Sequence, residues 1–172
     1  MAAILLLPFF LIRFGLLSYL SKKAVQRAAH FAPVFGKERA AYWLYQLSNA
    51  ALLVSPFFLK IVLSPGWLFL TGAAVYAVGA LLLTLSVFAF AAPSENGLQQ
   101  TGLYRFSRNP MYVSYFLFFL GCALLAQSLP YLLFLVVFQL SAHWIILSEE
   151  RYCLGQFGDA YARYMKKVRR YL

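Results

Sequence analysis

Charged residues are scarce in this chain, and acidic residues are the scarcest of them. Only 12% of its 172 residues are charged, and five acidic residues stand against fifteen basic ones. Soluble globular domains average roughly 25% charged residues, and the mean hydropathy here is +0.72. This composition excludes an ordinary water-soluble domain. Because a chain in lipid must satisfy its own backbone hydrogen bonds, we predict an all-α membrane helix bundle, organised as a single domain over residues 1–172.

Cysteine and histidine are too few to form a site by themselves. Cys122 and Cys153 cannot supply a disulfide framework, and His30 and His143 lack the spacing of metal ligands. The sequence also has no glycine-rich strand-to-helix loop and no phosphate-binding loop. We therefore predict no metal, and we expect any nucleotide-like cofactor to bind at helix ends.

Long apolar runs are what the chain has in abundance. A spanning helix needs about 20 apolar residues, and five runs approach that length. They are Ala2–Leu20, Tyr42–Leu63, Trp67–Ala92, Met111–Ala126 and Tyr131–Leu147. The first lacks the basic start of a signal peptide, so we interpret it as a retained helix. The last two are joined by only four residues, which predicts a helical hairpin between transmembrane helices four and five.

The charges fall on one side of this five-helix arrangement. Segments 21–41, 92–110 and 149–172 carry thirteen of the fifteen basic residues and all five acidic ones. The positive-inside rule predicts that this side is cytoplasmic and that the N-terminus is outside. The net charge of +10 is explained by the basic residues that fix the orientation in the membrane and by their attraction to anionic lipid. Membrane lipids are therefore expected partners, and nucleic acid is not.

Two polar stretches interrupt the apolar pattern, "GLYRFSRNPMY" (Gly102–Tyr112) and "SEERYCLGQFGDAYARY" (Ser148–Tyr164). The predicted hairpin brings both to the same cytoplasmic level, so we expect their polar residues to share one pocket. In the second stretch apolar residues recur at steps of three and four, which predicts a C-terminal amphipathic cytosolic helix.

The residue types in these stretches suit a cationic ligand that carries a carboxylate, such as S-adenosylmethionine. Arginines would pair with its carboxylate, and glutamates would accept hydrogen bonds from its hydroxyl or amino groups. Aromatic faces would attract its sulfonium. The residues in question are Arg105, Arg108, Glu149, Glu150, Tyr104, Tyr112 and Phe157.

These stretches also carry a family resemblance. The first is similar to the element G-P-Y-x-x-x-R-H/N-P-x-Y, and "EERYCLGQFGDAYARYMKKVRR" is similar to E-E-x-x-x-L-x-x-F-G-x-x-Y-x-x-Y-x-x-x-V-x-R. Both elements belong to the isoprenylcysteine carboxyl methyltransferase family, which includes phospholipid methyltransferases. The resemblance implies an integral membrane methyltransferase whose S-adenosylmethionine enters from the cytosol and whose lipophilic acceptor enters from the bilayer.

The resemblance also implies the positions of functional residues. Residues 93–172 would form the cofactor-binding core, after three N-terminal spans in residues 1–92. The implied cofactor-binding residues are Tyr104, Arg108, Asn109, Pro110, Tyr112, Glu149, Glu150, Phe157 and Tyr161. The candidate catalytic residues are Arg108, Glu150 and His143, the last two as bases if the acceptor must lose a proton. The acceptor stays open among an isoprenylcysteine-type carboxylate, a phospholipid amine and a small lipophilic molecule, and the oligomeric state is not predicted.

Two alternative functions and the role of Arg13 stay open. Cys153 is placed as in membrane reductases of the sterol-reductase type, which bind NADPH, although Gln156 stands where they carry lysine. A non-catalytic membrane protein of the same fold is the other alternative. Arg13 interrupts the first apolar run, which indicates a functional site, although its long side chain could instead reach the membrane interface.

Overall fold

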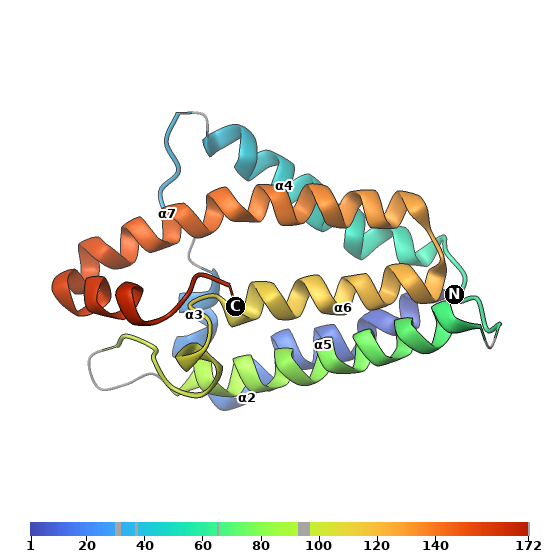
Figure 1. The fold of residues 1–172 in the computed structure, drawn as a ribbon, viewed down its shortest axis with the longest axis horizontal. Coiled ribbons are helices and arrows are strands. Elements are labelled where there is room, and N and C mark those ends of the chain that lie inside the picture. The colour runs from blue at the N-terminus through green and yellow to red at the C-terminus, as the bar shows by residue number, and fades with distance from the viewer. Residues whose placement is uncertain (30–31, 37, 65, 93–96, 172) are drawn as a thin grey trace.

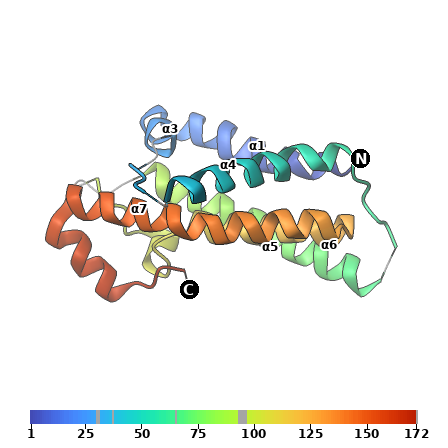
Figure 2. The same cartoon turned by 90° about the horizontal axis from the view of Figure 1, so that it is seen from above.

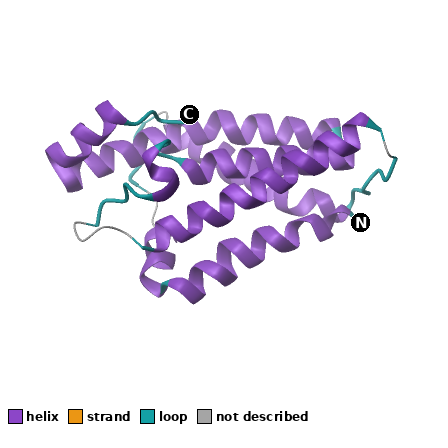
Figure 3. Ribbon diagram, turned by 60° about the horizontal axis from the view of Figure 1, so that its bottom comes forward, coloured by secondary structure: helices purple, strands orange, loops and turns teal. Residues whose placement is uncertain are grey.

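The computed structural model describes residues 1–29, 32–36, 38–64, 66–92 and 97–171, so His30 lies outside the described residues. Every regular element in this part of the chain is helical, and it contains no strand (Figure 3). The prediction of an all-α fold is confirmed. Three helical stretches are long and apolar enough to cross a membrane: Ala2–Leu20, α5 (Trp67–Ala91) and α7 (Leu129–Lys167).

The first of these stretches changes its helical type along its length. It consists of η1 (Ala2–Leu6), α1 (Leu7–Phe10), the π-helical η2 (Leu11–Leu16) and α2 (Leu17–Leu20). Ser21 is extended, and its hydroxyl caps the short α3 (Lys22–Ala29) by accepting from the Ala24 N–H at 3.2 Å.

The second predicted span is shorter than its apolar run. α4 (Glu38–Val54) is followed by one 3₁₀ turn, η3 (Ser55–Phe57), and residues 59–64 are not helical. The prediction of a helix over Tyr42–Leu63 is therefore wrong at its C-terminal end, where residues 58–63 are not helical. Pro56 explains the difference, because proline lacks an N–H and its ring clashes with the preceding helical turn.

α5 and α6 (Pro110–Ala126) pack side by side over most of their length (Figure 1). Their contact depends on residues without a side chain. A Cβ on Gly121 would lie 2.5 Å from the Cα of Tyr76, and one on Gly79 would overlap the backbone of Phe118. Small residues let helix backbones approach this closely in membranes.

A tight turn connects α6 to α7. Gln127 adopts the left-handed conformation (φ 47°, ψ 42°), and the Ser128 hydroxyl caps α7 by accepting from the Tyr131 N–H at 3.3 Å. The two helices then run in opposite directions (Figure 1).

α7 differs from the prediction at its C-terminal end. The helix does not stop near Glu150 but continues to Phe157, and at Gly158 the backbone leaves helical geometry (φ 50°, ψ −128°). A second helical piece then returns toward the bundle (Figure 2). The tail is thus a continuation of α7 that folds back at a glycine, because a positive φ costs glycine little.

One end of the bundle collects the polar segments. α3, the loop that begins at Gly97 and the folded-back end of α7 lie at the left of Figure 1, and the N-terminus lies at the opposite end. The helix directions therefore bring together the two polar stretches that lie far apart in the sequence.

Candidate functional site

A cavity of about 590 Å³ opens among the N-terminal helix, α4, α6, α7 and the loop that begins at Gly97. Its lining changes with depth. Glu149, Glu150 and Gln156 line the end near the polar segments, and Phe138 lines the cavity twelve residues before Glu150 on α7. At 1.5 Å per residue, Phe138 and Glu150 are about 18 Å apart along the helix. The cavity therefore joins a polar mouth to an apolar interior.

Helical spacing places the lining residues. Tyr45, Asn49 and Leu53 follow one another at four-residue steps on α4, and Tyr112, Tyr115 and Phe119 at steps of three and four on α6. Residues three and four apart share one face of a helix. Each helix thus presents a polar or aromatic residue near the mouth and an apolar one deeper in.

Glu150 is the centre of a buried charge cluster. Its Oε1 lies 2.9 Å from Nη2 of Arg108, and both side chains are at least nine-tenths buried. Arg170 donates to the same carboxylate through Nε at 3.1 Å and through Nη2 at 2.9 Å. These bonds raise the pKa of the Arg170 guanidinium. One carboxylate therefore binds two cations, and the cluster keeps a net positive charge.

The same cluster fastens the end of the chain to the start of α6. The N–H of Arg108 donates to the Arg169 carbonyl oxygen at 2.9 Å, and the Asn109 side chain donates to the carbonyl oxygen of Arg170 at 3.1 Å. Nearby, the Tyr164 hydroxyl donates to the Tyr104 carbonyl oxygen at 2.6 Å. Polar residues of both stretches thus hold the tail across the mouth of the cavity.

Glu149 has a different environment from its neighbour. Its carboxylate accepts a 2.9 Å hydrogen bond from the Tyr112 hydroxyl, and the ion pairs among the described residues do not include it. It lines the cavity beside Tyr112. Of the two adjacent acids, Glu149 is therefore the one that can accept further hydrogen bonds from a ligand.

Most residues predicted to bind a cofactor lie around this one cavity. The eight lining residues are Tyr104, Arg108, Asn109, Tyr112, Glu149, Glu150, Phe157 and Tyr161. Pro110 is instead the buried first residue of α6. His143 lies outside the lining, with its Nδ1 2.8 Å from the Tyr171 hydroxyl. Its role as a base stays a prediction.

Two buried polar atoms in the lining lack a hydrogen-bond partner in the described part of the chain. They are Nε of Arg108, a donor, and Oε1 of Gln99, an acceptor. Buried polar atoms are rarely left unpaired. These two atoms thus offer one hydrogen-bond donor and one acceptor to a bound molecule.

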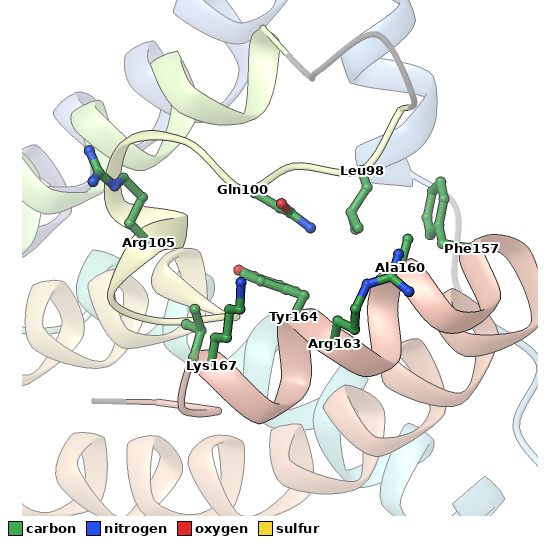
Figure 4. A pocket seen from close by; sticks show the side chains of 9 residues that line it. Leu98, Gln100, Arg105, Phe157, Ala160, Arg163, Tyr164 and Lys167 are labelled. Carbon is green, nitrogen blue, oxygen red and sulfur yellow. The ribbon is translucent and has the colours of Figure 1, made fainter.

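A second cavity, of about 760 Å³, lies between the loop that begins at Gly97 and the folded-back end of α7 (Figure 4). Arg105 is a lining residue of this cavity, together with Arg163 and Lys167. The expectation that Arg105 and Arg108 act on one ligand therefore does not fit the geometry, because the two side chains line different cavities. Leu98, Phe157 and Tyr164 line both cavities.

Sequence reasoning missed several residues of the first cavity. Arg170 has a signal, since it matches the final arginine of the second family element, yet nothing local connects it to Glu150. Tyr45, Asn49 and Tyr115 look like ordinary helix residues in the sequence and come to the cavity only through packing.

Comparison with known proteins gives two matches. The family profile described as phospholipid methyltransferase matches residues 67–160, which are 94 of the 172 residues. A protein-S-isoprenylcysteine O-methyltransferase of Schizosaccharomyces pombe is 40% identical over 68 residues, which are 39% of this chain and 29% of that protein. The matched segment thus spans less than a third of this relative. No solved structure matches the chain.

Proposed function

The chain belongs to the phospholipid methyltransferase family, and from this premise we propose that it is an integral membrane methyltransferase that uses S-adenosylmethionine. The match confirms the resemblance noted in the two polar stretches. The observation that carries the proposal is the first cavity, where family-type residues of both stretches surround a polar mouth that continues into an apolar interior. Such a space suits a polar cofactor beside a lipophilic acceptor.

We propose that five helices cross the membrane: the stretch Ala2–Leu20 together with α4, α5, α6 and α7. α4 and α6 have 17 residues each, which corresponds to about 25 Å at 1.5 Å per residue and lies at the lower limit for a span. The basic residues on segments 21–41, 92–110 and 149–172 support an external N-terminus and a cytoplasmic cavity mouth.

Labelling of single cysteines tests this orientation. Ser64 and Asp159 are both exposed and belong to opposite ends of the bundle. We expect Ser64→Cys to react with a membrane-impermeant maleimide added outside intact cells. Asp159→Cys should react only after permeabilisation, as should the background from the native Cys153. Labelling of the two variants in the reverse order would contradict the proposed orientation.

The residues of the mouth fit the cofactor. We propose that Glu149 accepts hydrogen bonds from its hydroxyl or amino groups, and that Nε of Arg108 donates to its carboxylate. The faces of Tyr112 and Phe157 would hold its positive centre by cation–π attraction. When bound, S-adenosylmethionine supplies an electrophilic methyl group on a sulfonium.

The protein's own contribution is then position and exclusion of water. Glu150 fixes Arg108 and fastens the tail through Arg170, so it organises the mouth of the cavity. The buried Tyr104 stays a neutral phenol because burial raises its pKa. Orienting two reactants in a closed, largely aromatic space accounts for much of an enzyme's acceleration of such a transfer.

Calorimetry with S-adenosylhomocysteine tests the cofactor proposal. We expect the purified protein in nanodiscs to bind it, and we expect Glu149→Gln to weaken binding roughly tenfold or more, because hydrogen bonds to a charged group contribute about 1.5–3 kcal/mol. Asp159→Asn is the matched control, since it neutralises an exposed acid outside the cavity lining. Absence of binding by the wild-type chain, or equal loss in both variants, would contradict the proposal.

A further inference from the structure

Arg13 is a charged residue of the cavity for which the proposed cofactor site has no use. It lies in the π-helical segment η2, inside a candidate membrane span, and its side chain lines the same cavity as Glu149. π-helical turns within longer helices occur frequently at functional sites. An ionisable residue inside a span is costly and usually faces a polar interior. The position of Arg13 therefore requires an explanation other than packing.

The Arg13 guanidinium has little around it to balance its charge. Its neighbours are uncharged: Nη2 donates to the Ala28 carbonyl oxygen at 3.3 Å, the guanidinium interacts with the Tyr115 hydroxyl, and it lies 6.0 Å from the centre of the Phe14 ring. None of the ion pairs found among the described residues includes it. Because a guanidinium carries five N–H donors, donors remain for an anionic ligand.

The other charged residues of the lining have partners or are assigned to the proposed cofactor. Arg108 pairs with Glu150, and its unpaired Nε faces the proposed cofactor site. Glu149 is an acid and cannot hold an anion. Arg27 also contacts one carbonyl oxygen and one ring, both of Phe90, but it is exposed on α3, outside the candidate spans. Among the described lining residues, Arg13 is thus the cation that lies inside a candidate span without an acidic partner.

Arg13 lies between the polar mouth and the apolar interior. Arg13 and Glu149 each interact electrostatically with Tyr45, Tyr104 and Tyr115. Both charged side chains therefore lie near the same group of tyrosines, without forming an ion pair with each other. On its own helix Arg13 precedes Leu20 by seven residues, which is about 10 Å. An anionic group held there would lie below the mouth, close to where a cofactor would end.

We propose that Arg13 binds the oxyanion of the methyl acceptor, and that the acceptor is an acidic amphiphile whose apolar tail lies against Phe9, Phe119 and Phe138. This inference rests on the proposed function and adds a residue that selects among the acceptors left open above, through their anionic group. The recognised chemistry is a carboxylate or phosphate oxygen that accepts charge-assisted hydrogen bonds from the guanidinium. A lipid-type carboxylate and a phospholipid phosphate are its two sources.

A purely structural role for Arg13 makes a different prediction. Its bond to Ala28 lies in the last turn of α3, where a cation is stabilising. If that were its whole contribution, loss of the guanidinium would lower thermal stability and weaken every ligand of the cavity alike. Charged and neutral ligands with identical tails separate the two roles.

The test is equilibrium binding to the purified full chain in neutral maltoside micelles. One pair of probes is oleate and oleamide, and the other is 1-oleoyl lysophosphatidate and 1-oleoylglycerol. We expect Arg13→Gln to weaken the acidic member of at least one pair by about tenfold or more, with its neutral partner unchanged. Arg13→Lys should restore part of the affinity. The pair that responds identifies the source of the oxyanion.

The same samples separate failure of this inference from failure of the proposed function. Wild-type protein that binds acidic and neutral probes equally would overturn the role of Arg13, as would Arg13→Gln weakening both alike. S-adenosylhomocysteine binding, measured in parallel, should be the same in Arg13→Gln and wild type. If neither protein bound it while the selective effect on acidic probes remained, the cofactor proposal alone would fail.

Discussion

Gly121→Ala is expected to be strongly destabilising, although it adds only one methyl group. The new Cβ would lie 2.5 Å from backbone and side-chain atoms of Tyr76, and real Cβ atoms do not approach heavy atoms so closely. The nearest atoms belong to the backbone of α5, so no side-chain rotation relieves the clash and the helices must separate. Overpacking of this kind costs typically 1–3 kcal/mol and occasionally more. We expect a clear fall in the melting temperature, measured by fluorescence-detected size exclusion after heating in detergent.

Gly155→Ala is the matched control for this substitution. Gly155 also lies in a helix, but a Cβ there would meet no atom within 4 Å. Alanine is a better helix former than glycine by roughly 0.8–1 kcal/mol, so the control should melt at or above the wild-type temperature. Equal melting of the two variants would mean that α5 and α6 do not pack through Gly121.

The sequence predicts the helices far better than it predicts their ends. α5 and α6 begin and end within a residue of their apolar runs, because hydrophobic length alone decides a span. α4 ends early because a single proline overrides the apolar residues that follow it. Gly158 likewise breaks α7, although the helical periodicity continues on both sides of it. Periodicity reports which face is apolar and gives no information about one residue with unusual backbone geometry.

The candidate site also has a part that the sequence predicts and a part that it does not. The two polar stretches predict that Arg108, Tyr112 and Glu149 lie together, because both stretches are at the same end of a bundle. The pairing of Glu150 with Arg170 could not be predicted, since it requires the fold-back at Gly158. The inward direction of Arg13 also depends on packing, because a span exposes some residues to lipid and others to the cavity.

Glu150→Gln is expected to lower the stability of the protein more than it changes any ligand contact. The substitution keeps the shape of the side chain but removes the negative charge that balances Arg108 and Arg170. Removing one member of a buried ion pair costs about 3–5 kcal/mol, because the partner charge is left uncompensated. The tail would then lose its attachment near the start of α6. Thermal melting of the purified variant in detergent measures the loss.

Two further variants separate the stabilising role of Glu150 from a direct role in binding. Glu149→Gln removes the adjacent charge, which accepts from a tyrosine hydroxyl and forms no ion pair in the described structure, so it should melt close to wild type while losing S-adenosylhomocysteine affinity. Arg170→Gln leaves the Arg108–Glu150 pair intact and should be destabilising to a smaller degree than Glu150→Gln. Because Glu150 and Arg170 share one network, combining their two substitutions should cost less than the sum of the single effects. A Glu150→Gln protein that melts like wild type but has lost the ligand would instead place Glu150 directly against the cofactor.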